Sequence, residues 1–434
     1  HKAEAGLDNR TPGIAALTSV AELMSCIAPK PFCHIAAVEG GLAPIASARE
    51  VSQRVAAAYA LTAQGNHVFV ETPGDAQRTR EVLAGFFAKS LLAQGDGSPV
   101  PEAPAQLEPS DAPNLRCFAE GNKPVAAPLL ALVHQILVAG PEFAAPPAGV
   151  AGPELSTWQG QVAARIRHVT ATPAPEGIGA PAEVVSAPVD GVTLRRVTVV
   201  PEAGITVPIL LAVKADLPAP PTVSVLLIGE RSKTDVIASP LARQLIEKGV
   251  LVCATDLRGI GELRADDKSS VLSTDLWMLG RTLAGERIAD ITAIARFLKM
   301  QPGMARVCVT GLAGMGNEAI LAAACTPEID AVIAEGPLAS YADLLSPAAT
   351  SWPASVYVPS ILKHLDLPAI ISSIAPRKAL LVAPIGSDHQ PVPADRDAVI
   401  AANPAYATLQ AAPALVVAPP APVTADQIMA VAAP

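Results

Sequence analysis

Aromatic residues are scarce in this sequence: Phe, Trp and Tyr together make up 3% of its 434 residues. Pockets that hold sugars normally use aromatic faces, so this scarcity counts against a carbohydrate ligand. Clusters of basic residues are also missing, and the net charge is −9. These two features argue against nucleic acid and against anionic membrane surfaces as partners.

Six cysteines are present, but none forms a C-x-x-C pair or a metal-ligand spacing with histidine. We therefore expect no metal site and no cofactor. Cys253 and Cys308 lie inside apolar runs, where buried free thiols are expected. Cys26 and Cys33 flank the run IAPKPF, and they form either a disulfide or two free thiols.

Long hydrophobic runs are missing too. The longest, residues 125–140, contains His134 and Gln135, so it predicts a buried helix and no membrane span. No signal peptide is visible, and the chain opens at His1 without an initiator methionine. We therefore expect the true N-terminus to lie upstream or to have been processed.

Proline, in contrast, is frequent, with 43 residues. Many of them cluster in residues 97–113, 141–153 and 172–183, which is typical of stiff linkers or edge loops. We therefore predict that a Pro-rich linker and connecting segment spans residues 97–184. Half of the residues are hydrophobic and 16% are charged, so the rest of the chain can build a large core.

The two ends of the chain resemble each other. The run IAPK at 27–30 returns as IAPR at 374–377, and every matched pair lies 347 positions apart. The same offset, without a gap, gives the identities Ala36 and Ala383, Pro44 and Pro391, Arg49 and Arg396, Tyr59 and Tyr406, and Val70 and Val417. We interpret this as an internal repeat whose first copy is represented only by its C-terminal part.

Strand-like and helix-like patterns alternate in the second copy. Two alternating segments, 191–200 and 204–213, predict an antiparallel pair. Near-continuous apolar strands follow at 222–230, 249–259, 306–311, 330–336, 378–384 and 414–419. Between them, 286–300 keeps helical spacing. Buried strands alternating with helices predict an α/β fold with a doubly wound, mostly parallel sheet.

One turn has the layout of a nucleophile elbow. Residues 307–318 read VCVTGLAGMGNE, which is a strand, a glycine-rich turn and the start of a helix. In the pattern G-x-S-x-G the serine sits two residues after the first glycine. Here that position is Ala313, and Met315 stands at the final glycine position.

These motifs, in their order, resemble the acetyl xylan esterase-like branch of the α/β-hydrolase superfamily. The second copy carries DLRGIGEL, LGRTLAGERIADITAIARFL, GLAGMGNEAILAAA and IAPR, and the first carries IAPKPF, PIASARE and VFVETPGD. The resemblance implies one complete α/β-hydrolase fold at 185–434 and the C-terminal part of a preceding copy at 1–96. It also implies an extracellular or periplasmic location.

The resemblance further implies a Ser-His-acid triad, and most of its positions are empty. The nucleophile position is Ala313. Candidate acids are Asp388, in the loop after 378–384, and Glu335, at the end of 330–336, but either fits a solvated loop or cap residue as well. No histidine follows the last strand, while His389 is a sequence neighbour of Asp388.

The first copy shows the same losses. Gly40 and Gly41 stand where the acid is expected, and Asp75 follows Gly74 where a histidine is expected. We expect Asp75 to cap the next helix. In the second copy, we expect Asp256 and Arg258 to pair and fix their loop.

Loss of histidine in both copies favours a non-catalytic α/β-hydrolase-like protein, a pseudoenzyme acting as a structural or binding subunit of a larger assembly. The alternative is a carboxylic-ester hydrolase of the acetyl xylan esterase type, with its active site upstream or with an unconventional triad. The expected partner is the upstream half of the first domain, roughly 250 residues by the repeat length. It belongs either to the same gene product or to a separate chain.

Overall fold

The computed structural model describes residues 11–38, 44–62, 66–102, 152–174, 182–185, 190–264, 269–345, 352–392, 406 and 414–433. The chain divides into two compact units, each considered by itself. Unit 1 comprises His1–Gly13 and Ala127–Pro434, and unit 2 comprises Ile14–Ala126. The predicted helix at 125–140 lies outside the described residues. The predicted domain limits 1–96, 97–184 and 185–434 remain predictions.

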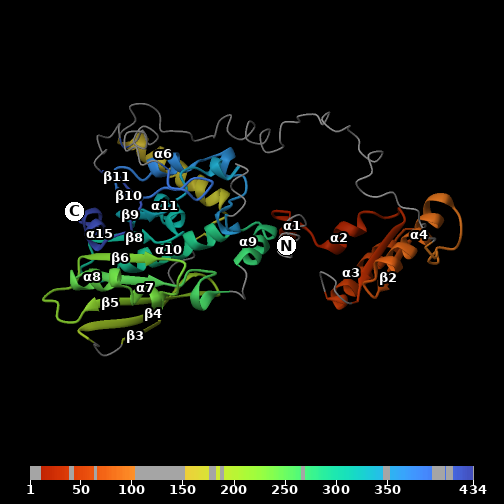
Figure 1. The fold of residues 1–434 in the computed structure, drawn as a ribbon, viewed down its shortest axis with the longest axis horizontal. Coiled ribbons are helices and arrows are strands. Elements are labelled where there is room, and N and C mark those ends of the chain that lie inside the picture. Colours follow the sequence, from red (N-terminus) through yellow and green to blue (C-terminus); the bar gives the residue numbers. More distant parts are fainter. Residues whose placement is uncertain are drawn as a thin grey trace. The chain divides into compact units, whose positions relative to one another are not determined.

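Within the described residues, unit 1 is built on a nine-stranded sheet in the order β11-β10-β9-β8-β6-β7-β5-β4-β3 (Figure 1). The strands are β3 Ala182–Val185, β4 Val192–Glu202, β5 Ile205–Lys214, β6 Val223–Ile228, β7 Leu251–Thr255, β8 Arg306–Gly311, β9 Ala331–Glu335, β10 Lys378–Val382 and β11 Leu415–Ala418. Strands β6 to β11 run parallel, whereas β3, β4 and β5 are antiparallel. The predicted mostly parallel sheet and its antiparallel pair are therefore confirmed.

Helices cover both faces of this sheet, as the alternation of side chains along each strand requires. In β6, Leu226 and Ile228 face one core cluster, and Val225 and Leu227 face the other. The first cluster is closed by α6 Pro153–Val169, α10 Leu283–Lys299, α11 Gly316–Cys325 and α12 Leu367–Ser372. The second is closed by α7 Lys233–Ile237, α8 Pro240–Glu247 and α15 Ala425–Ala432.

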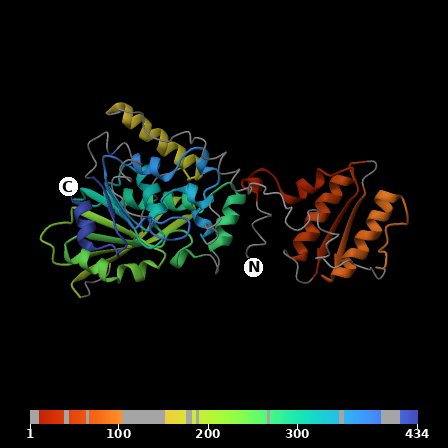
Figure 2. The same ribbon diagram turned by 45° about the horizontal axis from the view of Figure 1, so that its top comes forward.

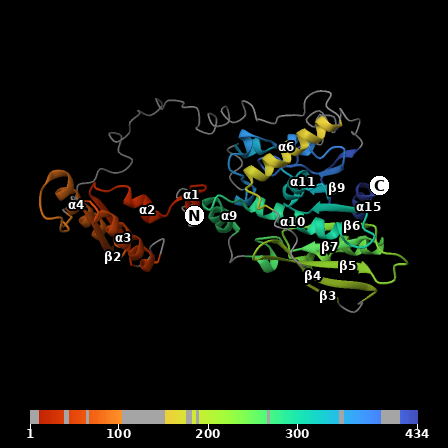
Figure 3. The ribbon, with the colours of Figure 1, turned by 180° about the vertical axis from the view of Figure 1, so that it is seen from behind.

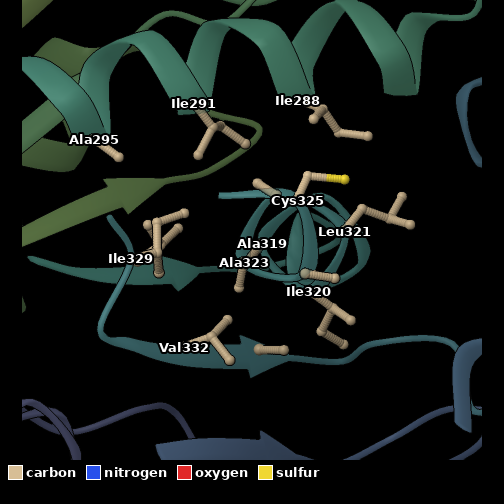
Figure 4. Close-up of a cluster of buried hydrophobic side chains, with 14 of the residues drawn as sticks. Ile288, Ile291, Ala295, Ala319, Ile320, Leu321, Ala323, Cys325, Ile329 and Val332 are labelled. Atoms are coloured by element: carbon tan, nitrogen blue, oxygen red, sulfur yellow. The ribbon is translucent and has the colours of Figure 1, made fainter. Parts of the chain in front are cut away.

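Helix α10 is the central support of the first face. The Thr282 side chain caps its first turn by accepting a hydrogen bond from the Gly285 N–H. Ile288 and Ile291 point from α10 towards α11, where Cys325 lies on the facing side of the helix (Figure 4). Because these side chains are buried, the α10–α11 contact fixes the helix that follows the glycine-rich turn.

Helix α6 lies inside the segment 97–184 that the proline content marked as linker. It packs against α11 (Figure 3). Its buried residues keep the helical spacing of one apolar face, namely Leu155, Trp158, Val162 and Ile166. The sequence did not predict this amphipathic helix, because the segments on both sides of it are rich in proline.

Unit 2 is a small α/β body in which strands β1 Phe32–Ala37 and β2 His67–Thr72 pair in parallel. Helices α3 Ile45–Tyr59 and α4 Ala76–Leu92 contact both strands from opposite sides (Figure 2). Helix α2 Val20–Ser25 packs on α3 and follows the single turn α1 Ile14–Leu17. As expected, the Asp75 carboxylate caps α4 by accepting a hydrogen bond from the Gln77 N–H, at 2.9 Å.

Two tyrosines occupy matching places in the two units. The Tyr59 hydroxyl donates to the Lys30 carbonyl at 2.7 Å, and the Tyr406 hydroxyl donates to the Arg377 carbonyl at 2.9 Å. Both members of each pair are related by the 347-residue offset. The peptide bonds Ala28–Pro29 and Ala375–Pro376 are both cis.

The described cysteines are free thiols. Cys26 is exposed and Cys33 is half-buried, so the free-thiol alternative describes this pair. Burial raises the pKa of the Cys308 and Cys325 thiols to about 12. Of the helices that the structure describes, none has the length and apolar character needed to cross a membrane.

We predict that Ile291→Ala lowers the free energy of unfolding of unit 1 by about 2–5 kcal/mol, because the fully buried side chain leaves a cavity between α10 and α11. Urea unfolding followed by tryptophan fluorescence measures this, since Trp158, Trp277 and Trp352 all belong to unit 1. The control Met300→Ala, at a 63% exposed position, is expected to cost less than about 0.5 kcal/mol. Equal effects for both variants would contradict the packing described.

We also predict that iodoacetamide at neutral pH modifies Cys26 in the folded chain and leaves Cys308 and Cys325 unmodified. The thiolate is the reactive form, and burial both blocks access to the last two and keeps them protonated. Peptide mapping by mass spectrometry after a timed reaction gives the answer. Rapid labelling of Cys308 without denaturant would show that the β8 core opens easily.

Candidate active site

The candidate site lies at the carboxyl ends of the parallel strands, centred on the turn between β8 and α11. Ala313 occupies the nucleophile position of this turn with a left-handed backbone, at φ 35°, and it is exposed. Non-glycine residues rarely adopt this conformation, which an elbow imposes on its central residue. The geometry of a nucleophile elbow is therefore present, and its side chain is a methyl group.

Glycines on either side of Ala313 allow the tight turn. A Cβ on Gly311 would lie 2.3 Å from the Met315 carbonyl oxygen, and one on Gly316 would lie 2.9 Å from the Glu335 carbonyl oxygen. Gly316 thus provides the close helix–strand approach, one residue later than the pattern G-x-S-x-G places its last glycine. This shift accommodates Met315, which is buried in the core.

The two candidate acids lie in different surroundings. Glu335, half-buried at the end of β9, accepts a hydrogen bond from the Ala313 N–H at 3.0 Å. Its carboxylate therefore touches the elbow itself. Asp388 instead accepts a hydrogen bond from the Gln390 N–H at 3.0 Å, which is the local loop contact expected of a structural residue.

His389 stacks on an aromatic ring. Its imidazole lies on the indole of Trp352, with ring centroids 4.3 Å apart and planes inclined by 19°. A cavity of about 550 Å³ opens beside the elbow, and none of the described residues that line it is a histidine. The sequence-based expectation that the base position is empty stays a prediction.

Charged residues of both signs line that cavity. They come from the loops after β6 and β7 and from the helices α7, α10 and α11, namely Glu230, Arg231, Asp235, Arg264, Arg287 and Glu318. The sequence did not identify these six as candidate site residues. Glu230, Arg231 and Arg264 could have been predicted from their positions after parallel strands, because the carboxyl ends of such strands meet at one edge of the sheet.

A buried ion pair lies behind the lining residues Ser232 and Gly261. The Lys233 ammonium donates to Asp256 at 2.7 Å and also contacts Glu262, while the Lys233 N–H donates to the other Asp256 oxygen at 2.6 Å. Burial disfavours the charged ammonium, but the hydrogen bonds to the two carboxylates outweigh it and raise the pKa of Lys233. The loop after β7 is therefore tied to the start of α7.

The predicted pairing of Asp256 with Arg258 is wrong. Arg258 reaches the opposite way, to Glu202 at 2.7 Å, to Asp290 at 2.8 Å and to Glu286. Asp256 is instead bound to Lys233 and accepts a hydrogen bond from the Glu262 N–H. The Arg258 cluster joins the β4–β5 hairpin, the β7 loop and α10.

Arg287 connects the Arg258 cluster to the helix that follows the elbow. Its guanidinium donates to the Arg258 carbonyl at 3.1 Å and to Glu318 at 2.8 Å, and both Arg287 and Glu318 are buried. Glu318 lies in the first turn of α11, where a carboxylate also suits the helix dipole. The cavity lining thus includes one buried ion pair, Arg287 with Glu318.

We predict that Arg258→Met destabilises unit 1 by about 3–5 kcal/mol, because it strands the buried Asp290 carboxylate. The matched control is Arg296→Met, also on the α10 side, whose pair with Glu328 is about one-third exposed. That control is expected to cost less than about 1 kcal/mol. Urea titration measures both, and a loss at Arg258 no larger than that at Arg296 would contradict the role given to the cluster.

Comparisons with known proteins give structural relatives only. No protein-family model and no curated protein matches the chain. A Bacteroides fragilis protein, provisionally assigned as an acetyl xylan esterase, has a TM-score of 0.55 and 16% identity, covering 72% of this chain and 91% of that chain. A glucuronoyl esterase from Solibacter usitatus has a TM-score of 0.47 and 14% identity, covering 62% and 86%.

Acetyl xylan esterase 1 from a Thermoanaerobacterium species gives a TM-score of 0.39 at 14% identity, covering 67% of this chain and 91% of that chain. At such identities a likeness concerns the fold alone. Together with the parallel strand order and the elbow after β8, the first of these likenesses confirms the expected fold class. The chain contains an α/β-hydrolase fold.

Proposed function

We propose that unit 1 is a non-catalytic α/β-hydrolase-like domain, a pseudoenzyme that acts as a structural or binding subunit of a larger assembly. One observation carries the proposal: the exposed residue at the centre of the elbow, in the strained conformation of a nucleophile, is Ala313. A methyl group has no lone pair with which to attack a carbonyl carbon.

The described residues that line the cavity beside Ala313 also support a non-catalytic role, because none of them is a histidine that could act as general base. A serine needs a histidine within hydrogen-bond reach to remove its proton. Among the described residues, the lining of the elbow cavity has no imidazole, and the His389 ring stacks on Trp352. Loss of a single triad member typically costs about 10⁴-fold or more in rate.

The electrostatics beside the turn also oppose ester chemistry. In the resembling enzymes the loop after β6 and the residue after the nucleophile supply the N–H groups that bind the oxyanion. Here the Glu230 carboxylate lies against Gly314: a Cβ on that glycine would be 2.5 Å from Glu230 Oε1. A negative charge at this place would repel a developing oxyanion.

The cavity itself favours a binding role. It keeps about 550 Å³ beside the elbow, and buried ion pairs hold its walls. Side chains that are already fixed lose little entropy when a ligand enters, so the pocket is pre-organised. Its mixed charge suits a polar ligand with both donors and acceptors.

The structural relatives favour a second candidate, a carboxylic-ester hydrolase of the acetyl xylan esterase type, because their names are those of esterases. In that case, the active site lies in the upstream half of the first domain or uses an unconventional triad. The resemblance alone supports an extracellular or periplasmic location for either candidate.

We further propose that the two units are tandem members of one superfamily. The offset of 347 residues and the matching Tyr59 and Tyr406 hydrogen bonds support this arrangement. Unit 2 would then represent the C-terminal part of a domain whose acid and histidine positions are also empty.

We predict that Ala313→Ser leaves hydrolysis of p-nitrophenyl acetate at the level of the parent chain, because a serine placed there has no base to activate it. Initial rates with purified chains measure this. The matched control is Ala93→Ser, another exposed alanine with a left-handed backbone, in unit 2. A rate for Ala313→Ser clearly above both the parent and the control would mean that a base lies within reach, and it would favour the hydrolase.

A further inference from the structure

The apolar residues of helix α2 form two stripes, and the described part of unit 2 uses one of them. Met24 and Ala21 face α3 and pack with Val55 and Tyr59. The second stripe has helical spacing but is open to solvent: Val20 is 54% exposed, Leu23 46% and Ile27 37%.

The repeat gives each of these exposed positions a counterpart. Helix α2, Val20–Ser25, corresponds residue for residue to α12, Leu367–Ser372, and both have a side-chain cap at the preceding residue, Ser19 and Asp366. Leu367 and Ile370 are 0% exposed and Ile374 is 1% exposed. In unit 1 these positions are buried because α12 packs on α11.

Strand β1 shows the same difference at its edge. In unit 1, β10 lies between β11 and β9. In unit 2, within the described residues, β1 pairs with β2 alone, and β2 corresponds to the edge strand β11. The side of β1 that has no described partner is therefore the side on which β10 meets β9.

The backbone groups on that side can be identified. The N–H groups of Phe32 and Val38 donate to the β2 side. Because backbone groups alternate along a strand, those of Cys33, Ile35 and Ala37 point the other way. Ile35 corresponds to Val382, whose carbonyl accepts a hydrogen bond at 2.8 Å from the Gly336 N–H at the end of β9.

We propose that the free edge of β1 and the outer stripe of α2 together form a docking surface. Its occupant is an α/β-hydrolase-like segment that precedes residue 1 in the same gene product. The segment adds a parallel strand to β1, as β9 does to β10, and covers Val20, Leu23 and Ile27 with a helix, as α11 covers α12. This inference holds whether or not unit 1 hydrolyses esters.

Nothing in the described part of unit 1 can fill this role without losing its own pairing. The strand of the required type is β9, and it already has β8 and β10 at its two edges. A second copy of the chain faces the same constraint. A preceding copy of the repeat, in contrast, has a β9-like strand whose natural neighbour is β1.

The test compares hydrogen exchange in two preparations: residues 1–434 expressed alone, and the intact gene product isolated from its natural source. In the first, the amides of Cys33, Ile35 and Ala37 are expected to exchange rapidly, while that of Phe32 is protected by β2. In the second, we expect the exchange rates of these three amides to be lower by a factor of about 100 or more. Denaturing mass spectrometry should give a single polypeptide heavier than 44.3 kDa.

A variant pair separates docking from folding. Leu23→Asp in the intact product is expected to abolish the added protection, because a charge enters the buried stripe. In residues 1–434 alone, the same variant should leave the Phe32 and Val38 amides protected, which shows that unit 2 still folds. The control Gln53→Asp places the same charge at an exposed site on α3 and should change neither.

Four results would overturn the proposal. These are equally rapid exchange of the three amides in both preparations, protection already present in monomeric 1–434, protection that appears only with a doubled native mass, and protection by a separate protein subunit. The second result would place the occupant within residues 1–434, and the third would identify a second copy of the chain.

Discussion

A parallel β-strand needs cover on both faces and a neighbour at its edges, and this constraint organises the whole chain. Unit 1 meets it with two layers of helices around β6 to β11, so that Leu226 and Val225 reach separate cores. Unit 2 covers the faces of β1 and β2 with α3 and α4, but the described residues leave β1 with one neighbour. The exposed stripe of α2 lies on a helix whose counterpart α12 is packed on α11, and both observations support the proposed docking surface.

The buried ion pairs of unit 1 bear on the proposal that its hydrolase scaffold is kept without catalysis. The strand ends that hold an active site also hold the fold, and here Lys233, Asp256, Arg258 and Arg287 are engaged in buried ion pairs that join strands to helices. Breaking one partner of a buried pair is costly, whereas replacing an exposed nucleophile by alanine is not. Under the proposed non-catalytic role, the cavity beside Ala313 is kept as a charged binding pocket.

Periodicity predicted the sheet well, because an apolar run such as 306–311 is buried on both faces when it forms a central strand of a parallel sheet. The elbow was also predictable, since Gly311 leaves space that no other residue does. The ion pairs were not. Asp256 and Arg258 are near neighbours in sequence, yet they point to different loops, and only the three-dimensional path brings Lys233 and Asp290 to them. Helix α6 was not predicted, because the flanking prolines dominate the local composition. The contact of Glu335 with the elbow was not predicted either, because its carboxylate accepts a hydrogen bond from a backbone N–H, which no residue spacing indicates.

The central claim is that the elbow of unit 1 has no activated nucleophile. Incubation of the folded chain with a fluorophosphonate, followed by intact-mass analysis, tests it most directly, because this reagent reacts with serines that a neighbouring base has activated. The account predicts an unchanged mass after prolonged exposure, under conditions that fully label a known serine esterase. A stoichiometric adduct on any residue of this chain would contradict it and would establish an active serine hydrolase.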